Sequence, residues 1–143
     1  MAAQFELKVL SPSRQVVSVQ AQAVTLPGTE GYMTILPGHA AMIAELDIGE
    51  VLVQTSTQTE RLFVAGGYVE VDHGRVKVLA DVVEKAKEID VNRAVEARKR
   101  ASGRLGTIDG TTDIDRASRS KKRADVRIMV AETMASVARE TKH

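Results

Sequence analysis

Apolar and polar residues alternate along the first part of the chain, up to about residue 80. The alternating runs lie at residues 5–9, 17–23, 69–71 and 76–78, and turn-forming pairs such as Pro27-Gly28 and Gly66-Gly67 separate them. A period of two buries one face of a β-strand, and frequent turn signals are typical of antiparallel sheets. The pattern predicts short strands in an antiparallel sandwich or barrel, with a hairpin turn at residues 72–74. No helix-length stretch is present here to connect parallel strands.

The pattern becomes helical from about Glu84. A helix is predicted over residues 90–105 with the Asp90 carboxylate as its cap, and a second helix from Ile114 to about residue 139. The segment 106–113 between them is expected to be a loop, with Thr112 or Asp113 capping the second helix. The apolar stripes consist mainly of alanine, at positions 94, 101, 117, 124, 131, 135 and 138. Two helices with a short connection predict an antiparallel hairpin with weak internal packing.

The chain is therefore expected to have an α+β fold with two domains, a β-sandwich over residues 1–83 and a helix-loop-helix over residues 84–143. Their charges differ in sign. Residues 1–83 hold five Lys and Arg against nine Asp and Glu, whereas residues 84–143 hold fifteen against ten. A basic helical part favours an acidic or polyanionic partner.

Several classes of protein are disfavoured by composition. The chain has no cysteine, which excludes disulfides, thiolate metal sites and a cysteine nucleophile. No apolar run approaches the roughly 18 residues of a membrane-spanning helix, and the N-terminus lacks the pattern of a signal peptide. We therefore expect a soluble chain that is kept in the cytosol.

No arrangement of residues indicates catalysis or metal binding. His39, His73 and His143 lie far apart, and we interpret them as two turn residues and a terminal residue. No glycine-rich phosphate loop occurs, and the acidic run 109–115 does not match a calcium-binding loop. The chain is expected to be neither an enzyme nor a metal-binding protein.

Arginines form a ladder on the predicted second helix. Arg119, Arg123 and Arg127 recur every fourth residue and so lie on one face, while Arg93 lies near the start of the first helix. Stacked cations repel one another unless an anion relieves them, so the ladder indicates a polyanionic ligand or an acidic protein surface. The alternative is a basic face in contact with solvent alone. Nucleic acid is not expected as a partner, because the basic segment has no aromatic side chain for stacking.

Three segments together resemble the epsilon subunits of bacterial F-type ATP synthases. They are residues 28–40 (GTEGYMTILPGHA), residues 63–71 (FVAGGYVEV) and residues 76–81 (VKVLAD). The resemblance extends over essentially the whole chain, including the helical hairpin. It implies a sandwich of about ten strands followed by a helix-loop-helix, and a subunit that performs no catalysis itself.

In this family the sandwich binds the gamma subunit and rests on the membrane-embedded ring of c subunits, so that rotation is coupled to ATP synthesis. The resemblance implies that residues 30–36 face the c-ring loops and that His39 lies near gamma. The residues given this partner-contact role are Glu30, Gly31, Tyr32, Met33 and His39. Tyr32 stands where the family often has an acidic residue, and Ala41 where it often has proline. The chain is expected at the cytoplasmic face of the bacterial cell membrane, held there only through the complex.

The resemblance also implies a regulatory role for the hairpin. In relatives it lies folded against the sandwich or extends along gamma into the catalytic head. There its basic helix meets acidic segments of the catalytic beta and alpha subunits and blocks ATP hydrolysis. The inhibitory basic face expected in this chain consists of Arg116, Arg119, Lys122 and Arg123. Weak alanine packing suits an exchange between two arrangements, because a small free-energy difference is easily biased.

Residues 89–94 (IDVNRA) match the motif Ile/Leu-Asp-x-x-Arg-Ala of ATP-binding epsilon subunits. By that resemblance Glu84, Ile89, Asp90 and Ala94 surround the adenosine, and Arg93, Arg123 and Arg127 meet the phosphates through charge-assisted hydrogen bonds. Bound ATP would then tie the two helices together. The alternative keeps Asp90 as a helix cap and the arginines as contacts for the acidic head. No cofactor is required, and ATP enters only as a regulatory ligand.

Two hypotheses therefore stay open. The first is a non-catalytic coupling and regulatory subunit of the proton-translocating ATP synthase. The second is a stand-alone ATP-sensing module whose hairpin closes on the nucleotide. Co-purification with gamma and the c-ring separates the two.

Overall fold

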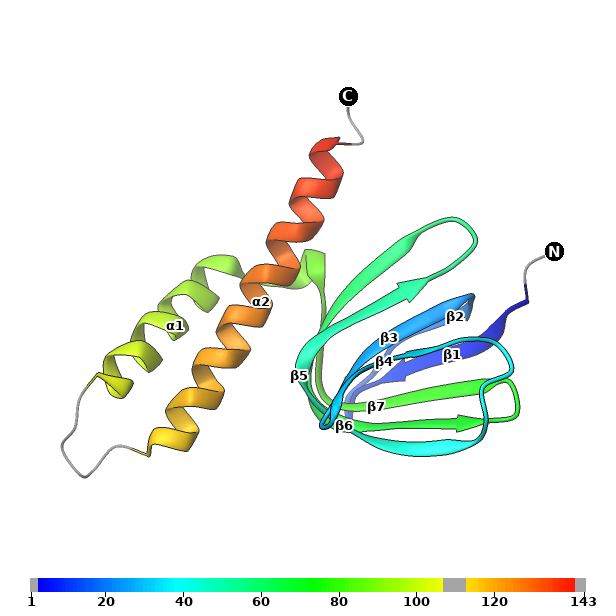
Figure 1. Ribbon diagram of the computed structural model, residues 1–143. Helices are drawn as coiled ribbons and strands as arrows, with labels where there is room; N and C mark the ends of the chain where they lie inside the picture. The colour runs from blue at the N-terminus through cyan, green and yellow to red at the C-terminus, as the bar shows by residue number, and fades with distance from the viewer. Residues whose placement is uncertain (1–2, 107–112, 141–143) are drawn as a thin grey trace. The chain divides into compact units, whose positions relative to one another are not determined.

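The computed structural model describes residues 3–106 and 113–140, and for residues 135–140 it describes the backbone alone. The chain divides into two compact units, Met1–Lys85 and Ala86–His143 (Figure 1). The first unit extends two residues beyond the expected boundary, because its last strand still pairs through Glu84 and Lys85 with the neighbouring strand. A sheet followed by a helical hairpin confirms the predicted α+β class.

Within the described residues, the first unit contains seven strands. They are β1 (Phe5–Leu10), β2 (Gln15–Ala21), β3 (Ala23–Gly28), β4 (Gly31–Ile35), β5 (Met42–Gln54), β6 (Thr59–Asp72) and β7 (Arg75–Lys85). They form one sheet in the order β2-β1-β7-β6-β5-β3-β4. Neighbouring strands are antiparallel except β1 and β7, which run parallel.

A kink shared by β5, β6 and β7 folds this sheet into a sandwich. In β6, Leu62 and Val64 point into the core before the kink, and Val69 and Val71 do so after it. The core positions thus change from even to odd numbers, and those of β5 and β7 change in the same way. One residue of each strand, Asp47, Gly66 and Asp81, is left out of the ladder at this level, while the register on both sides is unchanged. The three strands therefore change face together.

The kink explains the strand number. One layer contains β2, β1 and the segments of β7, β6 and β5 on one side of the kink, and the other contains β3, β4 and the remaining segments. About ten strands were expected and seven are present, because three long strands each pass through both layers. Apolar side chains of both layers form the core between them.

Two glycines make the kink sterically feasible. Gly66 has φ +77° and Gly67 has φ +118°, which are conformations that residues with a Cβ atom rarely adopt. A Cβ atom on Gly67 would also collide with the carbonyl oxygen of Leu79 on β7. The kink therefore requires glycine both for its backbone angles and for the close approach of β6 to β7.

The predicted turns are present. His73 and Gly74 connect β6 to β7 with φ angles of +42° and +81°, as a two-residue hairpin turn requires. In the segment between β4 and β5, the backbone amide of His39 donates to the carbonyl of Leu36 at 3.2 Å, with Gly38 at φ +83°. The interpretation of His39 and His73 as turn residues is confirmed.

The second unit consists of a short 3-10 helix, Ala86–Glu88, followed by α1 (Val91–Leu105) and α2 (Ile114–Glu140). Both predicted caps are confirmed. The Asp90 carboxylate accepts a hydrogen bond from the Arg93 amide at 3.0 Å, and the Asp113 carboxylate accepts one from the Arg116 amide at 3.0 Å. Most of the expected loop 106–113 lies outside the described residues, as does Thr112.

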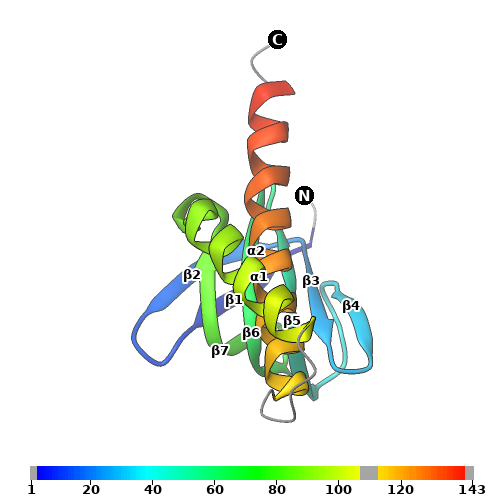
Figure 2. The same ribbon diagram turned by 90° about the vertical axis from the view of Figure 1, so that its left-hand side faces the viewer.

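The two helices run antiparallel (Figure 2), and alanines pack between them. The buried alanines are Ala94 and Ala101 on α1, and Ala117, Ala124 and Ala131 on α2, which also buries Ile128 and Val130. A spacing of seven residues keeps each row on one helix face, and small side chains let the backbones approach closely. We call these two rows the alanine seam. It buries little apolar area, so it stabilises the hairpin only weakly.

Replacing Gly67 with alanine should destabilise the sandwich strongly. We expect the free energy of unfolding to fall by more than about 2 kcal/mol, because a strained φ angle and a backbone collision act together. Gly74→Ala is the matched control, since Gly74 also has a positive φ angle but a Cβ atom there would meet nothing within 4 Å. Urea denaturation measures the free energy of unfolding of both variants. If both lose the same amount, the collision at Gly67 does not contribute and the prediction is wrong.

Enlarging the alanine seam should loosen the hairpin. In Ala124→Leu the added side chain has no space between the helices, because Ala124 is 1% exposed, and the expected cost is about 1–3 kcal/mol. Ser118→Leu, at an exposed position of α2, is the control. Thermal melting followed by circular dichroism at a helical wavelength measures the effect, and similar melting of the two variants would contradict the seam.

Candidate functional site

The residues expected to contact partner subunits lie around β4. Glu30 is in the turn between β3 and β4, and Gly31, Tyr32 and Met33 begin β4. His39 lies beyond the other end of β4, a strand of five residues that spans about 17 Å. The structure therefore brings the first four together and separates them from His39.

The hydroxyl of Tyr32 is hydrogen-bonded within the sandwich, whereas its ring is exposed. Its hydroxyl accepts a hydrogen bond from the Glu50 amide on β5 at 3.0 Å, which ties β4 to a strand that is not its neighbour in the sheet. Gly49 permits this contact, since a Cβ atom there would lie 2.7 Å from the hydroxyl oxygen and 2.5 Å from Pro27 Cβ. The side chain of Tyr32 nevertheless stays exposed, with a residue exposure of 61%, and its ring is free to contact a partner.

A hollow lies beside the β3–β4 turn. It has a volume of about 260 Å³ and is lined by Thr29, Glu30, Met33, Ile43, Ala44 and Glu45. The sequence did not identify the three β5 residues among these. A signal was available, because residues 42–44 are three consecutive apolar residues in a strand that should alternate. Ile43 is the outward one, with an exposure of 73%.

Further apolar side chains lie on the outer face of the sheet near this hollow. Tyr68 on β6 pairs across the ladder with Glu45 on one side and with Leu79 on the other, and Tyr68 and Leu79 are 54% and 44% exposed. With Ile43 they form what we call the outer apolar stripe, defined as Ile43, Tyr68 and Leu79. Clustered exposed apolar side chains mark protein interaction sites more often than isolated ones do.

The residues of the expected nucleotide site are distributed over both units. Glu84 belongs to β7 in the first unit, whereas all the others lie in the second. Asp90 caps α1 with its carboxylate, Arg93 is exposed, and Ile89 and Ala94 are buried at 8% and 3% exposure. The alanine of the motif is thus part of the alanine seam.

The antiparallel register orders the arginines along the hairpin. Arg98 on α1 forms an ion pair with Asp125 on α2 at 3.9 Å, so Arg93 lies level with about residue 130 of α2. Along the axis, Arg127 is then about 5 Å from Arg93 and Arg123 about 10 Å, at a rise of about 1.5 Å per residue. The Arg123 guanidinium donates to the Ser120 hydroxyl at 3.0 Å. Arg127 is the second-helix arginine that lies closer to the motif.

The predicted basic face lies on the side of α2 turned away from the alanine seam. Arg116, Arg119, Lys122 and Arg123 are centred about 130° around the helix from the buried alanines, at about 100° per residue. Arg116, Arg119 and Lys122 are exposed. Within the described residues, the guanidinium groups of Arg116 and Arg119 have no ion-pair partner.

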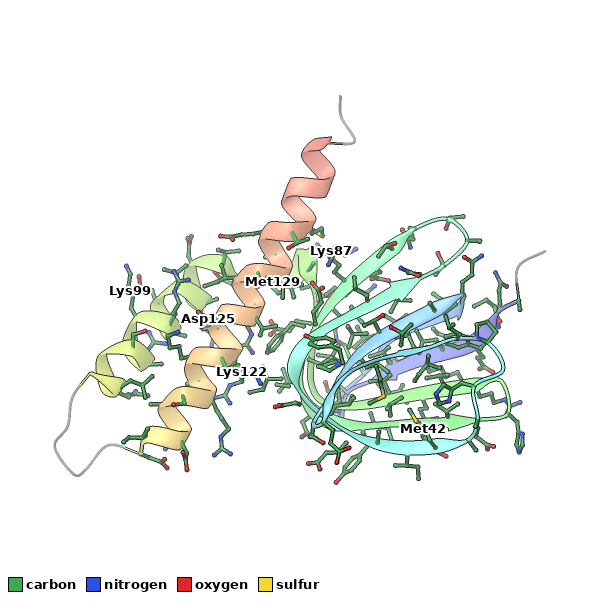
Figure 3. All side chains as sticks on the ribbon, viewed as in Figure 1. Met42, Lys87, Lys99, Lys122, Asp125 and Met129 are labelled. Carbon is green, nitrogen blue, oxygen red and sulfur yellow. The ribbon has the colours of Figure 1, made fainter. Side chains whose placement is uncertain are left out.

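Asp125 is a residue that sequence reasoning missed. It accepts from Lys121 at 3.0 Å and pairs with Arg98 across the hairpin, and Figure 3 shows it on the side of α2 that faces α1. It is the only acidic residue between positions 116 and 131. A single acidic residue in a basic segment is a sequence signal for an ion pair that could have identified it. Both pairs are about 40% exposed, so each contributes only about 0–1 kcal/mol.

Over residues 3–106 and 113–134, no three His, Asp or Glu side chains are grouped so that they could hold a metal ion. In the same part of the chain, none of the helices combines the length and the hydropathy that crossing a bilayer requires.

Family models and relatives match along most of the chain. The ATP synthase delta/epsilon chain β-sandwich domain matches residues 4–86, and the long α-helix domain of the same chain matches residues 87–132. The ATP synthase epsilon chain of Desulfitobacterium hafniense (strain Y51) is 38% identical over 131 residues, which cover 92% of this chain and 98% of the relative. That of Koribacter versatilis (strain Ellin345) is 45% identical over 107 residues, or 75% of each chain.

Solved structures agree in fold. A chain of the Euglena gracilis mitochondrial ATP synthase (OSCP/F1/c-ring) has a TM-score of 0.69 at 19% identity, covering 95% of this chain and 82% of the other. A chain of the Tetrahymena thermophila mitochondrial ATP synthase central stalk and c-ring has a TM-score of 0.62 at 15% identity, covering 88% and 95%. The matches to both domain models and to full-length bacterial relatives lead to one conclusion: this chain belongs to the epsilon-chain family of F-type ATP synthases, whose members are non-catalytic subunits of the complex.

Proposed function

We propose that this chain couples rotation to ATP synthesis through its sandwich and restrains ATP hydrolysis through its hairpin. The sandwich binds the gamma subunit and the c-ring, and the hairpin reaches the catalytic beta and alpha subunits. The solved assemblies with similar chains are named for F1, the c-ring and the central stalk, which supports this placement. The chain then lies at the cytoplasmic face of the cell membrane, as a peripheral component held by the complex.

The outer face of the sandwich supports a role in attachment. The outer apolar stripe and the exposed Tyr32 ring present apolar side chains to solvent on a domain that already has a complete core. Burying such groups against gamma or the ring gains about 25 cal/mol for each Å² removed from water. The rigid, long-stranded sheet suits a subunit that must turn with a shaft.

The regulatory part rests on one observation: the basic face of α2 is turned away from the alanine seam. Within the described residues, the guanidinium groups of Arg116 and Arg119 form no ion pair, and they are therefore available to an acidic surface on another subunit. Repulsion along the ladder costs about 0.2–0.5 kcal/mol for each pair four residues apart, and an acidic partner relieves it. The weak seam permits the hairpin to change its arrangement when that partner becomes accessible.

Removing residues 86–143 should release the enzyme from inhibition. We expect the sandwich alone to assemble with the complex. ATP hydrolysis should then be at least about fivefold faster than with the full chain, because a fivefold effect corresponds to the lower end of ordinary coupling free energies. The measurement is the ATPase rate of a complex reconstituted with either chain. An unchanged rate would contradict inhibition by the hairpin.

A variant of the full chain separates charge from folding. Arg116→Gln with Arg119→Gln removes two unpaired cations from an exposed face, so the helix should persist while inhibition weakens. The control is Arg100→Gln with Arg104→Gln, which removes two exposed cations from α1. If both double variants relieve inhibition equally, net charge acts rather than the basic face.

We further propose ATP as a regulatory ligand of the hairpin. Arg93 and Arg127 lie at nearly the same level of the two helices and could hold one phosphate chain between them. Asp90 caps α1, because its Oδ1 accepts from the Arg93 amide, and this fixes the start of the helix from which Arg93 emerges. These positions support the site implied by the IDVNRA motif.

Calorimetry with ATP on the isolated subunit tests this. Arg93→Ala and Arg127→Ala should each weaken binding about tenfold or more, since a hydrogen bond to a charged group contributes about 1.5–3 kcal/mol. Arg123→Ala should matter less because of its greater distance, and Arg104→Ala, at the other end of α1, should match the wild type. If the wild type gives no binding heat, or if these substitutions do not change the affinity, the proposal that ATP is a ligand is wrong.

Two substitutions at Asp90 separate its roles. Asparagine caps helices as well as aspartate does, whereas alanine costs about 1 kcal/mol of helix stability. If Asp90 acts only as a cap, Asp90→Asn keeps wild-type ATP affinity and Asp90→Ala loses some of it. Lost affinity in Asp90→Asn would instead show that the carboxylate charge contacts the nucleotide.

A further inference from the structure

Arginines and lysines lie on different sides of the helical hairpin. We measure angles around each helix from its first buried alanine, Ala94 or Ala117, at about 100° per residue. Arginines of both helices recur at about −80° to −120°, whereas the lysines of the described parts of α1 and α2 lie at about +40° to +140°. We call these arginines the arginine flank, and they are Arg93, Arg100, Arg104, Arg116, Arg123 and Arg127.

The two rows of the arginine flank lie on the same side of the hairpin. In an antiparallel pair whose seams face each other, positions with angles of the same sign lie on the same side. Arg98 and Asp125, at about +40° and +80°, form an ion pair between the helices at 3.9 Å, as this geometry requires. The arginine flank therefore borders a single groove between α1 and α2, on the side opposite to that ion pair.

The register of the helices spaces the guanidinium groups along this groove. The same ion pair places Arg100 level with Arg123. The other arginines follow toward both ends in steps of about 5–6 Å and on alternating helices, so the flank is about 20 Å long. Their order along the groove is Arg93, Arg127, the level pair, Arg104 and Arg116. The two ends are equivalent in spacing, and the proposed ATP site uses only one of them.

Acidic side chains of the hairpin lie at other angles. Within α1 and residues 114–134 they are at about 60° to 200°, and none shares the range of the arginine flank. Glu96, which is the nearest of them by angle, forms an ion pair with Lys99 at 3.6 Å. Cations gathered in one groove repel one another unless an anion lies between them. The flank therefore favours an anionic ligand that contacts both helices.

Small side chains leave the groove open between its two rows. Ala97 and Ser120 lie at about −60°, between the arginine flank and the alanine seam, and both are half-buried. The Arg123 guanidinium donates a hydrogen bond to the Ser120 hydroxyl at 3.0 Å, which holds this guanidinium beside the groove. Packed helices have axes about 8–10 Å apart. Long arginine side chains from both helices can therefore reach one ligand that lies along the groove.

The ligand must carry negative charge at short, regular intervals. An extended acidic peptide has carboxylates about 7 Å apart on one face, which is a wider spacing than that of the guanidinium groups. Nucleic acid brings bases that need stacking partners, and all aromatic residues of the chain precede residue 69. Linear inorganic polyphosphate carries a charge on each phosphate and has no bases. Guanidinium groups bind phosphate through two parallel hydrogen bonds.

We propose that the arginine flank binds linear inorganic polyphosphate along the groove between α1 and α2. This ligand goes beyond the proposed ATP site, in which Arg93 and Arg127 hold one triphosphate at one end of the groove. A polyphosphate chain contacts both helices at several levels and therefore stabilises the hairpin against separation. It also covers the ATP end, so polyphosphate and ATP compete for the hairpin.

Calorimetry on the isolated full chain tests the binding, with long-chain polyphosphate and inorganic triphosphate as the two probes. The long chain should bind about tenfold more tightly or better, because it reaches further charge-assisted hydrogen bonds. Arg104→Gln with Arg116→Gln should weaken its binding about tenfold or more. Lys99→Gln with Lys122→Gln is the matched control, since it also removes one cation from each helix, and its effect should stay below about twofold because of screening.

Thermal melting tests the contact with both helices. Circular dichroism at a helical wavelength should show a higher melting temperature with saturating long-chain polyphosphate than without ligand, because binding to the folded state stabilises it. The same measurement without ligand verifies that both double variants fold. An unchanged melting temperature of the wild type would show that the chain does not connect the helices, and the inference would be wrong.

Three other results would overturn the inference. The wild type could give no binding heat with polyphosphate, or the Arg104 and Arg116 double variant could bind it as the lysine control does. Single-stranded DNA or polyglutamate of matched charge could bind as tightly as polyphosphate, which would show that the groove takes any polyanion. None of these results decides ATP binding or inhibition by the hairpin, because the experiments proposed above test those separately.

Discussion

The close approach of β6 to β7 at Gly67 is the constraint on which the rest of the sandwich depends. Because one residue in each of β5, β6 and β7 leaves the ladder at the same level, all three strands change the face that they turn toward the core. A single sheet can then enclose its own core from two sides. Any side chain at Gly67 would separate the two strands at that level and open the sandwich.

The same kink determines what the outer face can offer. Glu45, Tyr68 and Leu79 lie together because the register of β5, β6 and β7 is continuous beside it, and the hollow forms where β5 meets the β3–β4 turn. The core is complete without these side chains. Apolar and acidic groups therefore remain on the surface of the sheet, where the proposed attachment to a partner subunit would use them.

The hairpin follows the opposite principle. Its helices meet along the alanine seam, and one partly exposed ion pair, Arg98–Asp125, connects them, so these contacts contribute little free energy. The residues of its basic face lie away from the seam, where the proposed regulation would bring them against an acidic partner. A chain with one rigid unit and one weakly held unit is suited to combine firm attachment with regulation.

The sequence by itself determined the elements and their order. Alternation with a period of two, turn residues at 72–74 and the caps Asp90 and Asp113 are local signals, and the structure confirms each of them. The basic face could also be predicted, because helical periodicity alone places its residues on one side. Binding of ATP by the residues of the expected nucleotide site remains a prediction. The motif specifies residue types on α1, but it does not specify how far these residues lie from the arginines on α2.

Only the tertiary structure decided the number of strands, the hollow and the role of Asp125. Each depends on residues far apart in sequence: the kink on three strands at one level, the hollow on β5 beside the β3–β4 turn, and the Arg98–Asp125 pair on the register of two antiparallel helices. Local periodicity carries no information about such pairings, because they are set by which surfaces pack together once the chain has folded.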